Sequence, residues 1–465
     1  MSGFFKEIPP YYEHQIETLE FSRNRVDAGE GRVFDASDPG TGKTRPAIGA
    51  FVERRQAGGK KALVLAPKSI LQPAWGQDIS KFFPGTSYIC AYSTNRQKAF
   101  EMDVDIYITN HDAVTWMVKK GNLPNDFWDQ FDTIIIDEST AYKNPKAKRS
   151  KAVAKLCTQF EFRTIMTGTP NPNSVTEFWH QVKLLDDGES LGTSFWKFRS
   201  VVCEPQQVGP SINHIKWKDK PGAEHVVYDL IEHMTIRHAY DDCHDSDFGD
   251  PYKVFYDLTR NERKKYDDMV DIAIAMLDDG TLLAPTQAST VHQKLMQMAS
   301  GAVYKGDGTY SLINDGRYEL IMDLIEARQQ CVVGFLWRHQ REELVKAAKK
   351  RKITYGVIDG AVKDAERTKA VTDFQSGAIR VMFAHPQSAG HGLTLTAGTT
   401  TIWSSPTYNS EHFTQFNARI NRAGQDKHTE TILVCARNTI DELVYDRLDD
   451  KLDSMQLLLD LLGDN

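Results

Sequence analysis

The sequence has few cysteines and no long apolar run. Its six cysteines lie far apart and form no Cys-x-x-Cys pair: Cys90, Cys157, Cys203, Cys243, Cys331 and Cys435. This usage is typical of a reducing compartment and argues against both a disulfide framework and a zinc finger. No stretch approaches the roughly 18 consecutive apolar residues of a membrane-spanning helix, so we expect no membrane partner. The N-terminal MSGFFKEIPP lacks the apolar run of a signal peptide. We therefore expect a protein that is not secreted but cytoplasmic in a bacterial or viral host cell, or nuclear if eukaryotic.

The composition is that of a globular chain with an unevenly placed charge. With 465 residues, 40% of them hydrophobic and 26% charged, a disordered or collagen-like chain is excluded and two to four domains are expected. Most of the net charge of -7 comes from residues 441–465, which hold eight acidic and two basic side chains. Two stretches are basic: 141–160 has six bases and no acid, and 338–352 has seven bases and two acids. These stretches are candidate contacts for a polyanion, and the alternative is two solvated helix faces.

Short runs rich in Val and Ile alternate with polar, helix-like stretches. The runs are Ala62–Ala66, Asp105–Thr109, Thr133–Asp137, Thr164–Thr167, Cys331–Phe335, Ile379–Phe383 and Thr431–Cys435. This alternation predicts buried parallel strands in βα units. The series breaks between about 180 and 325, where the sequence becomes helical and charged. We therefore predict an α/β fold of two lobes with a helical, loop-rich insert, and a ligand in the cleft between the lobes.

The segment GRVFDASDPGTGKT predicts a phosphate-binding loop. An apolar strand leads into a glycine-rich turn that ends in Lys43-Thr44, and a helical sequence follows. Gly40 and Gly42 allow backbone N–H groups to curl around an anion. Lys43 would bind the β- and γ-phosphates and Thr44 would bind Mg²⁺. The strict motif has glycine where this chain has Ser37, and the alternative is a glycine-rich turn with a chance Lys-Thr.

A second strand, in FDTIIIDESTAYKN, ends in two carboxylates, Asp137 and Glu138. If this strand shares a sheet with the strand before the phosphate loop, both carboxylates lie beside that loop. Asp137 would then hold Mg²⁺, and Glu138 would orient and deprotonate the attacking water. The alternative is an acidic turn at the end of a strand.

The segment QFNARINRAGQ places Arg419 and Arg422 three residues apart, on one face of an expected helix, with Gln415 four residues before Arg419. A guanidinium keeps its proton and can bind γ-phosphate oxygens. If this helix belongs to the second lobe, the two side chains reach the nucleotide only when the lobes close, as arginine fingers do. The alternative is a surface helix with two ordinary arginines.

In this order the motifs resemble those of helicase superfamily two, and within it the Swi/Snf-like ATPases of chromatin remodellers and annealing helicases. The resemblance runs from about Tyr11 to Lys451. It implies two RecA-like lobes with parallel sheets, an ATP cleft between them and short helical insertions. Residues 1–238 would form the first lobe with a helical protrusion. Residues 239–465 would form the second lobe, with a helical insertion at about 259–300.

The resemblance also implies roles for individual residues. Catalysis would rest on Lys43, Glu138, Arg419 and Arg422. ATP and Mg²⁺ would be bound by Gln15 in PPYYEHQIETLEF, which would read adenine, and by Gly40, Thr41, Gly42, Lys43, Thr44, Asp137, Gly392 and Gln415. Nucleic acid would contact Pro67, Lys68, Ser69, Thr109, Asn110 and Thr394. Coupling of the nucleotide state to lobe movement would use Thr167, Gly168 and Thr169 of IMTGTPNPNSVTEFW.

Three departures from the family's pattern are modest: Ser405 before Pro406, Tyr408, and Ala418 before Arg419. None of them removes an expected phosphate or metal ligand. A segment rich in metal-ligating residue types also occurs: His225, His233, His238, Asp241, Asp242, Cys243, His244 and Asp245. It coincides with the family's inter-lobe segment and has no finger spacing, so we expect no structural zinc there.

The implied function is that of an ATP-driven motor that translocates on double-stranded DNA and remodels DNA or protein–DNA complexes. ATP and Mg²⁺ are its expected cofactors. Its expected partners are duplex DNA and a recruiting protein that the sequence does not identify, and we expect a monomer. One alternative is a strand-separating or strand-annealing helicase on branched DNA or RNA. Another is a nucleotide-gated nucleic-acid clamp without turnover, against which the intact Glu138 and both arginines argue.

Overall fold

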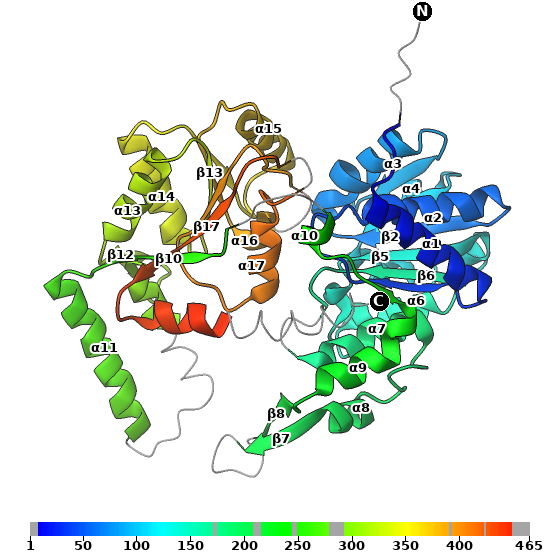
Figure 1. Cartoon of the computed structure of the whole chain (residues 1–465), viewed down its shortest axis with the longest axis horizontal. Coiled ribbons are helices and arrows are strands. Elements are labelled where there is room, and N and C mark those ends of the chain that lie inside the picture. The colour runs from blue at the N-terminus through cyan, green and yellow to red at the C-terminus, as the bar shows by residue number, and fades with distance from the viewer. Residues whose placement is uncertain are drawn as a thin grey trace, which may run out of the picture. The chain divides into compact units, whose positions relative to one another are not determined.

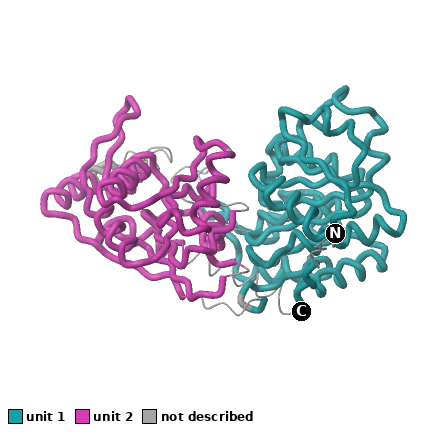
Figure 2. The backbone as a smooth tube through the Cα atoms, turned by 90° about the horizontal axis from the view of Figure 1, so that it is seen from above, with its two compact units in different colours: residues 1–245, 453–465 teal, residues 246–452 magenta. Residues whose placement is uncertain are grey.

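The computed structural model describes residues 8–170, 174–207, 215–243, 249–278, 293–389, 393–422 and 425–448, with only the backbone for Asp241, Asp364 and 272–278 (Figure 1). The chain divides into two compact units, one ending at residue 245 and the other spanning 246–452 (Figure 2). Each unit contains one large sheet whose strand pairs are all parallel. The predicted α/β class with a parallel sheet in each half is therefore confirmed.

The sheet of unit 1 has the strand order β3-β4-β2-β5-β6-β1-β9. Its strands are β1 (Arg32–Asp35), β2 (Lys61–Ala66), β3 (Tyr88–Ala91), β4 (Ile106–Asn110), β5 (Phe131–Asp137), β6 (Phe162–Met166) and β9 (Thr235–Ile236). Every residue of the central strand β5 is buried, as expected for a parallel strand covered on both faces. The four apolar runs predicted in this half coincide with β2, β4, β5 and β6 to within two residues at either end.

Helices cover both faces of this sheet (Figure 1). They are α1 (Glu13–Asp27), α2 (Thr44–Gln56), α3 (Gln77–Phe82), α4 (Arg96–Glu101), α5 (Val114–Met117), α6 (Lys148–Cys157), α7 (Phe178–Asp186), α8 (Phe195–Val202), α9 (Ala223–Ile231) and α10 (Tyr240–Cys243). A π-helical turn, η2 (Leu71–Gly76), follows β2. Ile48 and Phe51 of α2 pack with Val64 and with Trp75 of η2 in one buried cluster. This cluster fixes the helix after β1 and the turn after β2 against the same face of the sheet.

The sheet of unit 2 has the order β10-β17-β16-β13-β15-β14. Its strands are β10 (Tyr252–Tyr256), β13 (Cys331–Gly334), β14 (Tyr355–Ile358), β15 (Val381–Ala384), β16 (Thr400–Trp403) and β17 (Glu430–Ala436). Alternate residues of β15 enter different cores: Val381 and Phe383 pack in one buried cluster, and Met382 and Ala384 pack in another. Both faces of this sheet are therefore covered, as the runs of buried apolar residues predict.

The helices of unit 2 are α11 (Arg260–Asp278), α13 (Gly316–Glu326), α14 (Arg338–Lys350), α15 (Asp364–Gln375), α16 (Pro386–Ala389) and α17 (Ser410–Asn417). Residues 293–299 and 440–448 are also helical. Two antiparallel hairpins complete the described chain, β7 (Cys203–Gln207) with β8 (Ile215–Asp219), and β11 (Ala302–Tyr304) with β12 (Tyr310–Leu312). Among the described residues, no helix combines the length and apolar character needed to cross a membrane.

The predicted break in the strand series between about 180 and 325 is wrong at two places. β9 pairs in parallel with β1, and β10 pairs in parallel with β17, so both strands join the edges of the main sheets. β9 is only two residues long, and β10 is only half buried at its edge position. Neither strand therefore produces the continuous apolar run on which the prediction depended.

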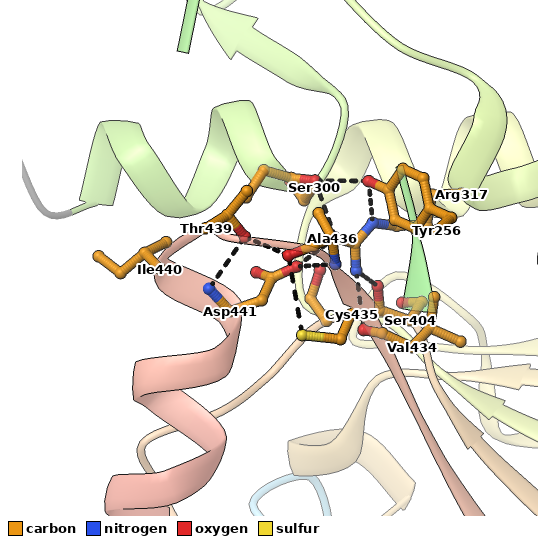
Figure 3. A network of polar contacts seen from close by, with 12 residues as sticks. Tyr256, Ser300, Arg317, Ser404, Val434, Cys435, Ala436, Thr439, Ile440 and Asp441 are labelled. Atoms are coloured by element: carbon orange, nitrogen blue, oxygen red, sulfur yellow. Dashed lines mark hydrogen bonds and ion pairs between the residues drawn. The ribbon is translucent and has the colours of Figure 1, made fainter. Parts of the chain in front are cut away.

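A buried arginine ties several elements of unit 2 together (Figure 3). Arg317 of α13 donates to the carbonyl oxygens of Ser404 (2.5 Å), Ala299 (2.8 Å) and Val434 (3.2 Å). It also pairs with the buried carboxylate of Asp441, whose Oδ2 accepts from the backbone N–H of Ala436 at 3.1 Å. One side chain thus joins α13 to the ends of β16 and β17 and to the helical residues 293–299.

Candidate nucleotide-binding site

The predicted phosphate loop lies between the end of β1 at Asp35 and the start of α2 at Thr44. Gly40 (φ 95°) and Gly42 (φ 80°) both have the left-handed backbone that favours glycine. The Lys43 ammonium group donates to the carbonyl oxygens of Ser37 (2.5 Å) and Asp38 (2.9 Å), so it lies over the loop. Ser37, where the strict motif has glycine, does not have a left-handed backbone, and its N–H donates to Asp35 Oδ1 at 3.0 Å.

Helix α1 contacts this loop from one side. Gln15 is 4% exposed, and its Nε2 donates to the carbonyl oxygen of Gly42 at 3.2 Å. A Cβ at position 42 would lie 2.7 Å from that Nε2, which gives Gly42 a second reason to be glycine. The ring of His14 hydrogen-bonds the carbonyl oxygen of Thr41 at 2.8 Å. Gln15, expected to read adenine, is thus placed directly against the loop.

The segment that follows β9 contacts the loop from another side, which the sequence reasoning missed. Arg237 Nη2 donates to Asp38 Oδ1 at 3.4 Å, and the Tyr240 N–H donates to Asp38 Oδ2 at 3.0 Å. The backbone N–H of His238 donates to Ser37 Oγ at 3.0 Å, and its carbonyl accepts from the Asp38 N–H at 3.0 Å. Burial lowers the pKa of His238, so its ring is neutral near pH 7. These contacts come from residues some 200 positions away, and no local signal reveals them.

The acidic strand end is level with the phosphate loop. Asp35 of β1 and Asp137 of β5 are both in register with Met166 of β6, which lies between them. The condition set by the sequence, that both strands share a sheet, is therefore met. Asp137 is 9% exposed, and its Oδ1 accepts from the Glu138 N–H at 3.0 Å. Glu138 has a left-handed backbone (φ 51°), which is strained for a residue other than glycine.

A tryptophan that lies outside the predicted site residues donates a hydrogen bond to the Asp137 carboxylate. The indole Nε1 of Trp75 donates to Asp137 Oδ2 at 2.9 Å, and Trp75 is fully buried. Trp75 lies in η2, six residues after Ser69. Its signal in the sequence is weak, because a tryptophan after an apolar run is most often a core residue.

The expected coupling residues bridge the loop and the acidic strand end. The Thr167 N–H donates to the carbonyl oxygen of Asp35 at 3.1 Å, and its hydroxyl lies 3.5 Å from Glu138 Oε2. The Thr169 N–H donates to Thr167 Oγ1 at 3.2 Å. A Cβ on Gly168 would lie 2.5 Å from Pro39 Cδ of the phosphate loop. All three residues are buried, and their contacts reach both the phosphate loop and Glu138.

In unit 2 the two expected arginines bind the same backbone carbonyl oxygen, and neither arginine lies in a helix. Helix α17 ends at Asn417, and the prediction that both arginines lie on one helix face is wrong. The Arg419 N–H bonds to the carbonyl three residues before it, so the helix tightens into turns. The side chain of Asn417 is bound by Trp403 Nε1 at 2.9 Å. Arg419 Nη1 (3.3 Å) and Arg422 Nη1 (3.4 Å) both donate to the carbonyl oxygen of Leu393.

Two further cofactor residues were expected in this unit. Gln415 is 1% exposed, and its carbonyl oxygen accepts from Arg419 Nε at 2.7 Å, so it lies beneath the arginines. Gly392 lies outside the described residues. Arg419 itself is 6% exposed, which the interpretation as an ordinary surface arginine does not explain.

The expected nucleic-acid contacts differ in exposure. Lys68 is exposed, and Pro67 and Ser69 are half-buried, directly after β2. Thr109 is fully buried and donates to the carbonyl oxygen of Ala91 at 2.7 Å, so its hydroxyl is used inside the sheet. Asn110 is half-buried and binds Arg96 at 3.1 Å. Thr394 Oγ1 lies 3.4 Å from Arg422 Nη1.

The segment rich in metal-ligating types shows no such centre where it is described. His244 and Asp245 lie outside the described residues, and only the backbone of Asp241 is described. Within the described ranges, no three His, Cys, Asp or Glu side chains are grouped so that they could hold a metal ion. His238 is instead engaged with Thr18 at 3.1 Å, beside the phosphate loop.

Comparison with known proteins agrees with this arrangement. Residues 14–300 match the SNF2-related domain, and residues 316–424 match the helicase conserved C-terminal domain. Protein p41 of Acyrthosiphon pisum secondary endosymbiont phage 1 is 28% identical, over 98% of both chains. A Caenorhabditis elegans homologue of the SWI/SNF-related matrix-associated actin-dependent regulator of chromatin subfamily A-like protein 1 is 23% identical, over 96% of this chain and 61% of its own length.

Among solved structures, the Sulfolobus solfataricus SWI2/SNF2 ATPase core in complex with double-stranded DNA is 20% identical. That match has a TM-score of 0.44 and covers 98% of this chain and 94% of the other. The SNF2-related match alone spans more than half of the chain. The chain therefore belongs to the SNF2-related family of ATPases and carries that family's helicase C-terminal domain.

Proposed function

We propose that this ATPase is a motor that translocates on double-stranded DNA and thereby remodels DNA or protein–DNA complexes. The observation that supports it best is that Asp35 and Asp137 lie at the same level of one sheet, with Lys43 over the loop that follows β1. The residues proposed to bind phosphate and to activate water thus lie at one edge of a single sheet. Work on a polymer also needs a second unit that responds to the nucleotide, and the helicase C-terminal match of residues 316–424 supports this role for unit 2.

In this proposal Lys43 and the loop's N–H groups bind the β- and γ-phosphates of ATP. The Thr44 hydroxyl and the Asp137 carboxylate are the proposed Mg²⁺ ligands, and such an all-oxygen donor set suits this ion. When bound, Mg²⁺ would neutralise charge on the phosphate oxygens. Glu138 accepts the proton of the attacking water. Its Oε2 lies 3.5 Å from the Thr167 hydroxyl.

Arg419 and Arg422 are proposed to stabilise the charge that develops on the transferred phosphoryl group. Their common contact with Leu393 holds the two guanidinium groups together in unit 2. Nothing else in the described parts of this unit brings two arginines to one carbonyl oxygen. Exchange of that oxygen for phosphate oxygens would couple closure of the two units to hydrolysis.

Exposed bases of unit 1 support the nucleic-acid partner. On α6, Lys148, Lys151 and Lys155 are exposed at positions i, i+3 and i+7, while Val153 on the opposite side is buried. No ion pair of these three lysines occurs within the described part of the chain. Such a row can neutralise phosphates along a nucleic-acid backbone.

A second cationic surface lies nearby in the same unit. Lys146 lies over the ring of Trp196 (5.1 Å), and Arg199 lies between the rings of Trp196 (4.6 Å) and Trp217 (3.8 Å). Trp196 is 55% exposed. Stacked aromatic and guanidinium groups of this kind bind bases or sugars as well as phosphates.

The second basic stretch, residues 338–352, forms ion pairs within its own unit. Directly after α14, Arg351 pairs with Glu319, Asp323 and Glu326 of α13, and Lys350, the last residue of α14, also pairs with Glu319. Arg341 pairs with Asp359 at 2.6 Å. This stretch therefore fits the alternative of a solvated, ion-paired helix face, and we leave it out of the proposed nucleic-acid surface.

The function is tested by ATP hydrolysis across plain duplex, single-stranded DNA, forked DNA and RNA. We expect plain duplex to stimulate hydrolysis, and a triplex's third strand to be displaced while a fork stays closed. Separation of paired strands must overcome stacking of about 1.4 kcal/mol per step. ATP-dependent opening of the fork without triplex displacement would favour the strand-separating helicase. Nucleotide-controlled binding without phosphate release would favour the clamp.

A further inference from the structure

We propose that Trp75 is a positioning residue for the Asp137 carboxylate, and that its indole N–H sets how strongly Mg²⁺ contributes to nucleotide binding. This proposal rests on the proposed role of Asp137 as a metal ligand. It assigns a task to a residue outside the motifs that bind phosphate or metal. The inference starts from one buried contact, Trp75 Nε1 to Asp137 Oδ2 at 2.9 Å.

The positions of both residues in this contact, Trp75 and Asp137, are fixed by the fold. Trp75 is fully buried and packs in the cluster that contains Ile48 and Phe51 of α2 and Val64 of β2. Its ring therefore cannot turn without disturbing the helix that begins at the phosphate loop. Asp137 is the last residue of β5 and is held in the sheet by its neighbours β2 and β6. An indole N–H is a donor only, so this bond has one direction.

The two oxygens of Asp137 have different partners. Oδ2 accepts the indole N–H, while Oδ1 accepts the backbone N–H of Glu138 at 3.0 Å. Together these bonds fix the plane of the carboxylate, because rotation about its Cβ–Cγ bond would break both. A carboxylate oxygen has two lone pairs, so an oxygen that accepts a hydrogen bond can also bind a cation. A carboxylate whose plane is already set loses less conformational freedom when it binds a metal, and outer partners of ligating groups typically change metal affinity by about 10–100-fold.

Trp75 also belongs to the segment that carries the proposed nucleic-acid contacts Pro67, Lys68 and Ser69. The 3₁₀ turn Lys68–Ile70 and the π-helical turn Leu71–Gly76 follow each other without a break. π-helical turns are rare and occur often at functional sites. The segment thus joins an exposed lysine to a buried hydrogen bond on Asp137 within eight residues.

The test measures ADP binding to the full chain by calorimetry, once with Mg²⁺ and once in excess EDTA. Trp75→Phe keeps an aromatic ring but removes the N–H. We expect its affinity in EDTA to match the unmodified protein, while the gain in affinity produced by Mg²⁺ falls about tenfold or more. Trp179→Phe is the matched control, because Trp179 is also buried (5% exposed) and donates its N–H to the carbonyl oxygen of Gly192 at 2.8 Å. It should leave both affinities unchanged.

Asp137→Asn separates failure of this proposal from failure of the metal assignment. If Asp137→Asn keeps the Mg²⁺ gain, the assignment of Asp137 is wrong and the role of Trp75 is overturned with it. If Asp137→Asn loses the gain but Trp75→Phe keeps it, only the positioning role is overturned.

A measurement on the unmodified protein keeps the proposal testable if Trp75→Phe does not fold. The chain has eight tryptophans, whose indole N–H signals can be observed with ¹⁵N-tryptophan labelling. On addition of Mg²⁺ to the ADP complex, we expect one indole signal to shift, and that signal should persist in Trp179→Phe. Indole signals that all stay unchanged would overturn the proposal.

Discussion

Arg317 and Asp441 form an ion pair in the interior of unit 2, with their side chains 0% and 1% exposed (Figure 3). The two residues are 124 positions apart in the chain, and their pair joins α13 to the helical residues 440–448. Three backbone carbonyls share the same guanidinium group. A buried charge of this kind is tolerated because nearly all of its donors have partners.

Replacement of Arg317 by Met should therefore destabilise unit 2 strongly. The change leaves a buried, uncompensated carboxylate and three carbonyls without their donor, so we expect a loss of about 3–5 kcal/mol. Urea unfolding followed by circular dichroism measures it. Arg437→Met is the control, since its pair with Asp257 is mostly exposed (50% and 77%), and its loss should stay below about 1 kcal/mol. Equal losses in the two variants would contradict the importance assigned to the buried pair.

Glu138→Gln should keep ATP bound and slow its hydrolysis by about 10²–10⁴-fold, because only the proton-accepting oxygen is lost. Lys43→Ala should instead weaken ATP binding, since the ammonium group over the loop is removed. Phosphate release and ATP binding, measured on the same preparations, distinguish the two effects. Hydrolysis by Glu138→Gln at the unmodified rate would show that another group activates the water.

Arg419→Ala and Arg422→Ala should each leave ATP binding largely intact and slow hydrolysis by about 10³-fold or more. In the proposed mechanism these guanidinium groups act mainly on the transition state, after unit closure. Arg437→Ala, on the exposed surface of the same unit, serves as the control. Near-normal turnover in both single variants would show that the two arginines have only a structural role, at the carbonyl oxygen of Leu393.

The sequence predicted most of what lies within single segments. The buried runs gave β2, β4 and β5 because strands buried on both faces leave continuous apolar sequence. The phosphate loop followed from glycines whose left-handed backbone the structure confirms. Each of these signals is local.

Contacts between distant segments could not be predicted in the same way. Arg237 reaches Asp38 across 199 positions, and Trp75 reaches Asp137 across 62. Short edge strands such as β9 have too few residues for a pattern. The last residue of α17, Asn417, is bound by Trp403, which is a tertiary contact. The burial of Thr109 likewise follows from its neighbour strand β3.

Stability should fall as the pH is lowered from 7 to 5, because two buried histidines resist protonation. Burial lowers the pKa of His180 in unit 1 and of His339 in unit 2 to about 4. The unfolded chain, whose histidine pKa values are near 6.5, then binds more protons than the folded chain. The contribution of each neutral histidine to the free energy of unfolding is therefore complete above pH 6.5 and is lost as the pH falls toward 4. Each histidine should cost about 2 kcal/mol at pH 5. Urea unfolding at both pH values measures this, and His339→Gln should flatten the dependence for unit 2. An unchanged slope in that variant would contradict the assignment.

DNA affinity should depend on the exposed lysines of α6 and not on those of α14, although the chain is acidic overall. Reversal of Lys148, Lys151 and Lys155 to Glu should weaken duplex binding at 50 mM salt and lower the slope of log affinity against log salt by about three, one for each lost phosphate contact. Reversal of Lys346, Lys349 and Lys350 on α14 changes the net charge by the same amount, but two of these lysines already pair with carboxylates of their own unit. We expect that control to change the slope by less than about one.

Fluorescence anisotropy over a salt series measures both variants. Equal slopes in the two variants would show that total charge, rather than the α6 row, governs binding, and an affinity independent of salt would exclude a phosphate-tracking surface.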